Sequence, residues 1–303
     1  MSGDERARGG GARGPAPAPA PLPFGTARDA LAWAVAALRD GVSESPRLDA
    51  EVLLRHLLDW DRAQLFARLN DPLPEAAASG YRPLIARRVA GEPVAYLVGE
   101  REFMGLSFVV GPGVLVPRPE TEDLVEWLVA RIRAESRWHG GPRIVDVGTG
   151  SGAIALSLAS LLPAARVVGV DLSPLALRYA RENRARLNLD RRVGLVRGDL
   201  LAPIGAADVI AANLPYLRPD QLHTGIADEP AEALFAGQDG LDLYRALLPQ
   251  AARLLHSPGI LVAEIDPSQT VAMRDLCRAA FPTSTVQVQR DLAGFDRFVS
   301  VVH

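Results

Sequence analysis

The chain has 303 residues, which is room for one large domain and a smaller one, and its single cysteine, Cys277, excludes an intramolecular disulfide. Its formal net charge of −3 argues against binding to nucleic acid or to an anionic membrane, because there is no excess of positive charge. No apolar run is long enough to cross a bilayer, and the first residues carry acids without an apolar segment, so we expect a cytoplasmic protein with no signal peptide.

The first part of the chain separates into a tail and a helical segment. Residues 1–22 are mainly Gly, Pro, Ala and Arg, which have little apolar surface to bury, so they predict a disordered tail. Residues 23–98 carry apolar side chains at helical spacing, and the first helix is predicted to have its N-cap at Thr26. This segment shows no cluster of titratable residues, so we interpret it as a helical substrate-recognition domain and not as a reaction centre.

The rest of the chain predicts a hairpin and then a sheet. Residues 99–115 are expected to form a hairpin linker that turns at Met104-Gly105. In residues 116–303, a helix is expected at 120–133, and short apolar segments then alternate with helical ones. Such alternation is typical of an α/β fold with a doubly wound, mostly parallel sheet and helices on both faces. The segments expected to be strands are 144–147, 167–170, 193–196, 209–212, 260–263, 286–288 and 298–301.

A glycine-rich run follows the first of these strands and predicts a cofactor site. The run Gly148-Thr149-Gly150-Ser151-Gly152 leads into a helix, where glycines let the backbone approach a ligand closely. Asp171 ends the second predicted strand, where a carboxylate can accept hydrogen bonds from both ribose hydroxyls of an adenosine. Together these residues predict a site for an adenosine cofactor.

The identity of the cofactor depends on residues outside the glycine run. Gly148, Gly150 and Ala153 also satisfy the fingerprint of dinucleotide-binding proteins. A carboxylate in the first strand, Asp146, favours S-adenosylmethionine instead, because this cofactor carries a cationic sulfonium and an amino group. Two further cofactor-binding candidates follow the third strand: Asp199 for the adenine amino group and Leu200 for the adenine face.

The segment Asn213-Leu214-Pro215-Tyr216 follows the fourth predicted strand and predicts the chemistry. Open α/β sheets bind ligands at the carboxyl ends of their strands, and Pro215 holds Leu214 in an extended conformation. The Asn213 amide oxygen and the Leu214 carbonyl can then accept both hydrogens of a planar –NH2 group, with Tyr216 packing beside it. This arrangement indicates methylation of an amide or an aromatic amine, with Asn213 also next to the donor.

The chain resembles the HemK/PrmC family of protein-(glutamine) methyltransferases, which modify peptide chain release factors. The resemblance runs from about residue 26 to residue 302. It rests on the glycine run, on the Asn-Leu-Pro-Tyr segment, and on further stretches that are more specific. These stretches are residues 91–97 (GEPVAYL), 116–122 (VPRPETE), 228–235 (DEPAEALF) and 239–242 (DGLD).

The resemblance implies a Rossmann-like class I S-adenosylmethionine-dependent methyltransferase domain with a seven-stranded sheet, a small all-helical N-terminal domain and a β-hairpin linker. It implies S-adenosylmethionine as the methyl donor and the glutamine of a Gly-Gly-Gln motif in class I release factors as the acceptor. By the same resemblance, cofactor roles fall on residues 148–152, Asp171, Leu200 and Asn213, and acceptor roles on residues 213–216. The sequence departs from the family at Leu214, where the family usually has Pro, and at Leu200, where some members have Trp.

Other functions remain open at this point. The Asn-Leu-Pro-Tyr segment also resembles the motif of ribosomal RNA adenine dimethyltransferases, which would require a basic surface. The glycine pattern leaves open an NAD(P)-dependent oxidoreductase, and Leu214 leaves open a non-catalytic adaptor that only binds the cofactor. We expect no metal site, because the histidines lack metal-ligand spacing. These are His56, His139, His223, His256 and His303.

Overall fold

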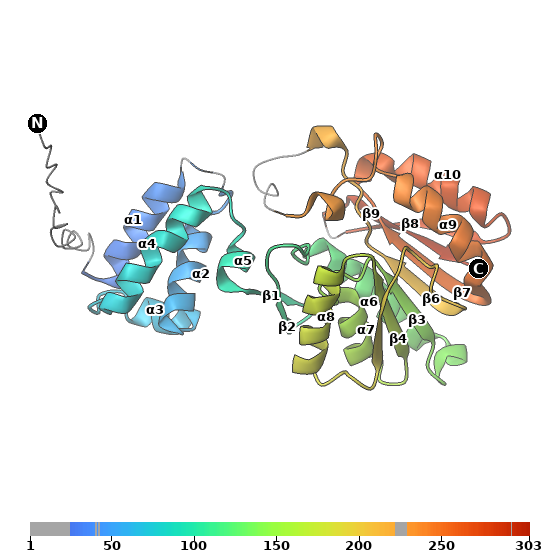
Figure 1. Cartoon of the computed structure of the whole chain (residues 1–303), viewed down its shortest axis with the longest axis horizontal. Coiled ribbons are helices and arrows are strands. Elements are labelled where there is room, and N and C mark those ends of the chain that lie inside the picture. Colours follow the sequence, from blue (N-terminus) through green and yellow to red (C-terminus); the bar gives the residue numbers. More distant parts are fainter. Residues whose placement is uncertain (1–24, 40, 42, 222–228, 292) are drawn as a thin grey trace, which may run out of the picture.

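The computed structural model describes residues 25–39, 41, 43–221, 229–291 and 293–303. The tail predicted for residues 1–22 therefore lies outside the described residues, as do His223 and Asp228. The described chain folds into a helical region, a hairpin and a helix-covered sheet, which follow one another along the sequence (Figure 1).

The helical region packs around a buried apolar cluster. The first helix begins directly after Thr26, whose hydroxyl accepts a hydrogen bond from the Asp29 N–H, so the predicted helix start is confirmed. Tyr81 lies fully buried in the cluster, and its hydroxyl donates to the Ala50 carbonyl across 2.7 Å, so this polar group is not left unpaired in the core. The helices are α1 (Ala27–Arg39), α2 (Pro46–Leu58), α3 (Arg62–Ala67), α4 (Glu75–Val89) and α5 (Val94–Val98).

A short antiparallel hairpin connects the helical region to the sheet, as the sequence predicts. Its strands are β1 (Glu100–Phe103) and β2 (Leu106–Val109), and Met104 and Gly105 both have positive φ at the turn. Asn183, on α8 (Pro174–Arg186), donates to the Val109 carbonyl and accepts from its N–H, at 3.0 and 2.6 Å. The amide of Asn183 therefore fastens the hairpin to the sheet region.

All seven predicted strands appear in one sheet, in the order β5-β4-β3-β6-β7-β9-β8. Neighbouring strands run parallel except at β9, which is antiparallel to both β7 and β8. The strands are β3 (Arg143–Val147), β4 (Arg166–Asp171), β5 (Val193–Arg197), β6 (Ala207–Ala212), β7 (Leu255–Glu264), β8 (Thr285–Arg290) and β9 (Asp296–Val302). The sheet is doubly wound and mostly parallel, as expected.

Helices cover both faces of this sheet and give it two apolar cores. Along β3, Ile144 is buried in one core, whereas Val145 and Val147 are buried in the other, because successive side chains of a strand point to opposite faces. The helices α6 (Glu120–Ala134), α7 (Ala153–Leu161) and α8 cover the first face, and α9 (Asp242–Leu254) and α10 (Thr270–Ala280) cover the second (Figure 1).

The strand order changes direction between β3 and β6, and this place positions the candidate site. From β3 the chain continues to β4 and β5 on one side, and then crosses to β6 and β7 on the other. The segments that leave β3 and β6 therefore diverge around a crevice at the carboxyl edge of the sheet. The glycine run follows β3 and the Asn-Leu-Pro-Tyr segment follows β6, so the fold brings both predicted motifs together.

Candidate functional site

The glycine run forms a tight loop between β3 and α7 that requires its glycines. Gly148 and Gly150 have φ values of 72° and 58°, a backbone region that disfavours most side chains. A Cβ atom at Gly148 would lie 2.9 Å from a methyl group of Leu214. The loop after β3 and the segment after β6 therefore lie in direct contact, and a larger residue at position 148 would force them apart.

Asp146 stabilises this loop by accepting hydrogen bonds from Thr149 and Ala155. We expected this carboxylate to lie near the cationic part of a donor, but the structure buries it beneath the loop and outside the cavity lining. Its Oδ2 accepts hydrogen bonds from the Thr149 hydroxyl at 2.6 Å and from the Ala155 N–H at 3.1 Å. Burial raises the pKa of Asp146 to about 7. Thr149, Ser151 and Gly152 are likewise absent from the lining, so among the run only Gly148 and Gly150 face the cavity.

The cavity beside the glycine run, which we call the donor cavity, has a volume of about 500 Å³. Asp171 lies at the end of β4 in its wall, and its two carboxylate oxygens accept from the N–H groups of Gly150 and Ser173, both at 2.8 Å. Each oxygen keeps a lone pair that a ligand hydroxyl can use. Burial raises the pKa of this carboxyl, and the backbone hydrogen bonds oppose the rise. The residues fit the ribose of an adenosine cofactor.

The structure brings the remaining predicted cofactor residues to the same cavity. Asp199 and Leu200 follow β5 and both contribute to the lining, with Leu200 buried and Asp199 exposed. Leu200 has a φ of 49°, unusual for a residue with a side chain. This conformation places an apolar side chain in the wall of the cavity, as a planar base requires.

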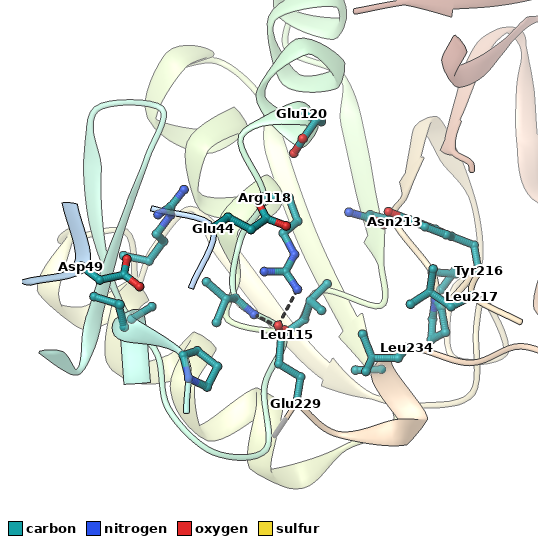
Figure 2. A pocket seen from close by; sticks show the side chains of 18 of the residues that line it. Glu44, Asp49, Leu115, Arg118, Glu120, Asn213, Tyr216, Leu217, Glu229 and Leu234 are labelled. Atoms are coloured by element: carbon teal, nitrogen blue, oxygen red, sulfur yellow. Dashed lines mark hydrogen bonds and ion pairs between the residues drawn. The ribbon is translucent and has the colours of Figure 1, made fainter. Parts of the chain in front are cut away.

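A second cavity, which we call the acceptor cavity, has a volume of about 600 Å³ and lies between the helical region and the sheet region. Figure 2 shows that Asn213 and Tyr216 lie on one side of it, opposite Glu44 and Asp49 from the helical region. Asp49 forms an ion pair with Arg88 at 2.7 Å, with both side chains nearly buried. The helical region therefore contributes charged side chains to this cavity.

The two cavities meet at the Asn-Leu-Pro-Tyr segment. Asn213, Leu214 and Pro215 line both of them, together with Leu115 and Ala233. Tyr216 lines the acceptor cavity but not the donor cavity. A group bound on the donor side therefore faces a group bound on the acceptor side across these residues.

An ion pair joins two of the specific stretches on which the family resemblance rests. Arg118, which precedes α6, pairs with the fully buried carboxylate of Glu229, and the same carboxylate accepts from the Val116 N–H at 3.1 Å (Figure 2). Glu229 thereby holds the segment before α6 against the segment after β6 in the wall of the acceptor cavity. This pairing could not be predicted from the sequence, because its partners are separated by more than a hundred residues.

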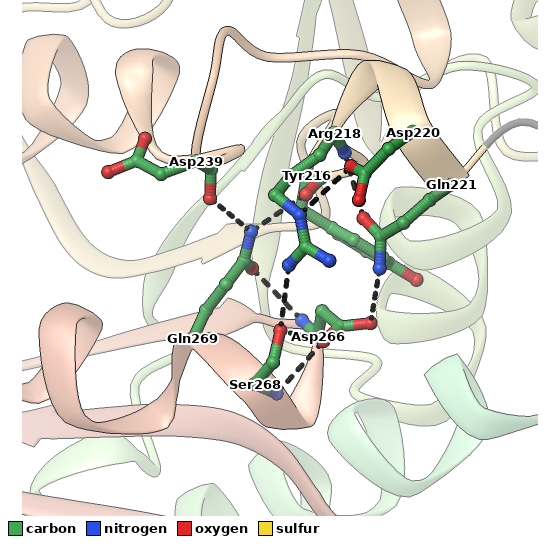
Figure 3. Close-up of polar contacts among 8 residues, drawn as sticks. All are labelled: Tyr216, Arg218, Asp220, Gln221, Asp239, Asp266, Ser268 and Gln269. Carbon is green, nitrogen blue, oxygen red and sulfur yellow. Dashed lines mark hydrogen bonds and ion pairs between the residues drawn. The ribbon is translucent and has the colours of Figure 1, made fainter.

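Gln269 fixes the backbone directly after the Asn-Leu-Pro-Tyr segment. This buried side chain donates from Nε2 to the carbonyls of Tyr216 and Asp239, at 2.7 and 2.9 Å, and its Oε1 accepts from the Asp266 N–H at 3.1 Å (Figure 3). Gly240 leaves room for this contact, since a Cβ atom there would lie 2.0 Å from the Tyr216 carbonyl oxygen. Sequence reasoning missed Gln269, although Asp266-Pro267-Ser268-Gln269 is a capping box at the start of a helix, because this motif does not indicate the contact with Tyr216.

The described part of the chain offers neither a metal site nor a membrane span. It contains no group of three or more His, Cys, Asp or Glu side chains that are placed to hold a metal ion. Its helices are also too short or too polar to cross a membrane.

Comparison with known proteins shows the class to which the protein belongs. A model of a methyltransferase domain matches residues 139–290, and a model of the PrmC N-terminal domain matches residues 29–99. The crystal structure of the hMettl16 catalytic domain resembles this fold with a TM-score of 0.53, at 15% identity, over 75% of this chain and 81% of that chain. The protein has the fold of class I methyltransferases, and its methyl donor is S-adenosylmethionine.

The relatives define the family. A release factor glutamine methyltransferase of Moorella thermoacetica is 47% identical over 277 residues, which is 90% of this chain and 96% of that protein. A second one, of Rhodopirellula baltica, is 38% identical over 278 residues, which is 89% and 94% of the two chains. The chain belongs to the release factor glutamine methyltransferase family. This membership confirms the resemblance and decides against an NAD(P)-dependent oxidoreductase.

Proposed function

We propose that this enzyme transfers a methyl group from S-adenosylmethionine to the side-chain amide nitrogen of the glutamine in the Gly-Gly-Gln motif of class I peptide chain release factors. One observation carries the proposal: Asn213, Leu214 and Pro215 line the donor cavity and the acceptor cavity at once. Methyl transfer needs such a junction, because donor and acceptor must approach each other directly. The name shared by the relatives supports release factors as the protein substrate.

On the donor side, the residues of the chain bind and orient the cofactor. The backbone at Gly148 and Gly150 admits it closely, with Thr149, Ser151 and Gly152 shaping the loop. Asp171 accepts hydrogen bonds from its ribose hydroxyls, while Asp199 and Leu200 contact its adenine. When bound, S-adenosylmethionine supplies an electrophilic methyl group.

On the acceptor side, residues 213–216 activate the substrate amide, which is a weak nucleophile. The nitrogen lone pair of a glutamine side chain is delocalised into its carbonyl group. Asn213 Oδ1 and the Leu214 carbonyl accept hydrogen bonds from the two N–H groups of the glutamine side chain. These bonds aim the nitrogen lone pair at the methyl group of the donor and favour rehybridisation of the nitrogen. Pro215 keeps Leu214 extended, and Tyr216 packs beside the substrate. No general base is required, because the methylated amide cation loses its proton readily.

We assign substrate recognition to the helical domain at residues 23–98, with a hairpin linker at 99–115 and the methyltransferase domain at 116–303. The contribution of Glu44, Asp49 and Arg88 to the acceptor cavity supports this division. A substrate loop that enters this cavity contacts both domains. The proposed location is the cytoplasm, where release factors act.

The test is to incubate the full-length enzyme with a release factor and labelled S-adenosylmethionine, and to map the added methyl group by mass spectrometry. We expect a single methyl group on the glutamine of the Gly-Gly-Gln motif. A release factor in which this glutamine is replaced by alanine is the matched control and should remain unmodified. Methylation of the control, or of added RNA in preference to the release factor, contradicts the proposal.

A further inference from the structure

Glu264 is a buried carboxylate with an unsatisfied oxygen, directly behind the Asn-Leu-Pro-Tyr segment. It ends β7, the strand that pairs with β6, and is 3% exposed. Its Oε2 is buried and makes no hydrogen bond of good geometry with any described residue. An unsatisfied buried carboxylate oxygen is destabilising, so its presence requires an explanation beyond packing.

Glu264 contacts the Asn-Leu-Pro-Tyr segment through two tyrosines. The Tyr216 hydroxyl donates to Oε1 of Glu264 at 3.3 Å. The Tyr244 hydroxyl donates to the Glu264 backbone carbonyl at 2.5 Å and accepts from the Leu214 N–H at 3.4 Å. Position 264 is therefore connected to Leu214 and to Tyr216, within the segment whose carbonyl group is proposed to bind the substrate amide.

A third connection reaches Asn213 through Thr121, at the start of α6. The Asn213 Nδ2 donates to the Thr121 hydroxyl oxygen at 3.1 Å. The Thr121 hydroxyl also lies near enough to Glu264 to lower the pKa of its carboxyl, without a hydrogen bond of good geometry to Oε2. Thr121 is 3% exposed, so water does not compete freely for its single hydroxyl hydrogen.

The ionised carboxylate gives this chain of hydrogen bonds a direction. A carboxylate only accepts, so Thr121 must donate its hydrogen to Glu264 and can only accept from Asn213. The –NH2 group of Asn213 then donates its hydrogen bond to Thr121, and the amide oxygen of Asn213 faces the cavity. An oxygen in that place can accept from a substrate –NH2 group, whereas a nitrogen would repel it.

We propose that Glu264 is a positioning residue that acts through Thr121 to fix the orientation of the Asn213 amide toward the substrate. This inference rests on the proposed function, because it presumes that Asn213 accepts a hydrogen bond from the substrate amide. The positioning role also explains the unsatisfied Oε2, which can accept a hydrogen bond from the Thr121 hydroxyl.

Protonation of Glu264 would remove this control. Burial is the main cause that raises the pKa of Glu264, to about 7 once all its neighbours are included: the Thr121 and Tyr216 hydroxyls and Arg297 on β9 lower it, and Glu120 on α6 raises it. Tyr244, on α9, adds no charge, because its own pKa is well above the ordinary value. The carboxyl therefore changes its charge within the range in which the enzyme can be assayed.

The protonated form carries a hydrogen that it can donate to Thr121. The hydroxyl of Thr121 can then donate to Asn213 Oδ1, which turns the amide nitrogen toward the substrate. Because the ionised form is the one that holds the amide correctly, kcat should fall as the pH is lowered through the pKa of Glu264.

The first test compares two variants of Thr121 in the full-length enzyme. Thr121→Val keeps the shape but removes the hydroxyl, so kcat should fall roughly 10- to 100-fold, with the affinity for S-adenosylmethionine unchanged. Thr121→Ser restores the hydroxyl and should recover most of the loss. The exposed Thr285→Val, on β8, is the matched control. A Thr121→Val enzyme with kcat within about twofold of the parent overturns the proposal.

The second test is the pH profile of kcat at saturating donor, which separates Glu264 from the carboxylates of the donor cavity. Between about pH 5.5 and 8.5 the parent enzyme should lose activity on the acid side, and Glu264→Gln should show a flat profile. Thr121→Val should be flat as well, since the connection is broken. An acid limb with the same midpoint in Glu264→Gln overturns the proposal.

The failure of this inference and the failure of the proposed function give different results. If Asn213→Ala abolishes turnover but Thr121→Val leaves kcat unchanged, or Glu264→Gln leaves the pH profile of kcat unchanged, the positioning role is wrong and the proposed function stands. If Asn213→Ala also retains full activity, the assignment of the acceptor site is wrong. Calorimetric donor binding shows which variants are folded, and either Thr121→Val or Glu264→Gln alone suffices for the decision.

Discussion

The donor cavity and the acceptor cavity are built in different ways. The donor cavity is built mainly on a glycine loop and on the ends of neighbouring strands, as in the hydrogen bond from the Gly150 N–H to the Asp171 carboxylate. The acceptor cavity uses side chains that the fold collects from distant segments, including Asp49, Arg118 and Glu229. A cofactor of fixed shape can be bound by a local loop, whereas a protein substrate must be contacted over a wide area. The two cavities should therefore respond differently to substitution.

The largest effect is expected at Asn213, where the cavities meet. Asn213→Ala removes the acceptor that orients the substrate amide, so kcat should fall roughly 100- to 1000-fold, as for the loss of one preorganised hydrogen-bonding group in other active sites. The affinity for S-adenosylmethionine should change only a few-fold, because other residues provide most of the donor contacts. Single-turnover assays and calorimetry measure the two quantities. Asn70→Ala, at an exposed position of the helical region, should change neither.

The donor cavity should show the opposite pattern when Asp171 is replaced. Asp171→Ala removes a charged acceptor for two ribose hydroxyls, and we expect a loss of roughly 1.5–3 kcal/mol in donor binding, about 10- to 150-fold in Kd. At saturating donor, kcat should remain close to that of the parent enzyme. Asp275→Ala, which removes an exposed carboxylate on α10, is the control. Unchanged donor affinity in Asp171→Ala would refute the ribose assignment.

The same contrast explains how much the sequence could predict. All seven strands, the helix that begins after Thr26 and the hairpin turn at Met104-Gly105 follow from short-range patterns, and the structure contains them. The donor-side residues form a contiguous run and an aspartate at a strand end, so their proximity could also be predicted from the order of the elements.

The acceptor segment itself could be predicted, but the side chains that support it from distant segments could not. Thr121 reaches Asn213 across 92 positions of the sequence, and Tyr216 reaches Glu264 across 48. Such pairs depend on which strands become neighbours, and no local pattern records that. Asp146 shows a different limit on the donor side: its strand could be predicted from the apolar pattern, but the direction of its side chain could not.

A smaller effect is expected at Gln269, which supports the acceptor side from outside the cavity. Gln269→Leu keeps the volume but removes the donor to the carbonyls of Tyr216 and Asp239, each of which then lacks that partner. We expect the free energy of unfolding to fall by about 1–3 kcal/mol and kcat to fall roughly tenfold, because the loop loses its fixed position. Gln287→Leu, at an exposed position on β8, is the control. Loss of stability without loss of kcat would show that Gln269 is only structural.

The smallest effect is expected at Leu214, where the family resemblance leads us to expect a proline. The proposed mechanism uses the backbone carbonyl of this residue, which Leu and Pro both have, and Pro215 already restrains its conformation. Two contacts would change in Leu214→Pro: the 3.4 Å hydrogen bond to the Tyr244 hydroxyl, and the buried side chain against Gly148. The hydroxyl of Tyr244 would still donate to the Glu264 carbonyl, so it would keep one partner.

We therefore expect Leu214→Pro to lower the free energy of unfolding by about 1 kcal/mol, because one long hydrogen bond and part of a buried side chain are lost. Its kcat should stay within a few-fold of the parent value, with the donor affinity unchanged, when both are measured on the folded enzyme. A collapse of kcat in a variant that still binds S-adenosylmethionine would mean that the Leu214 N–H or side chain takes part in holding the acceptor. The acceptor cavity would then depend on a contact that a proline at this position cannot make, and the assignment of the Leu214 carbonyl to the substrate amide would lose its main support.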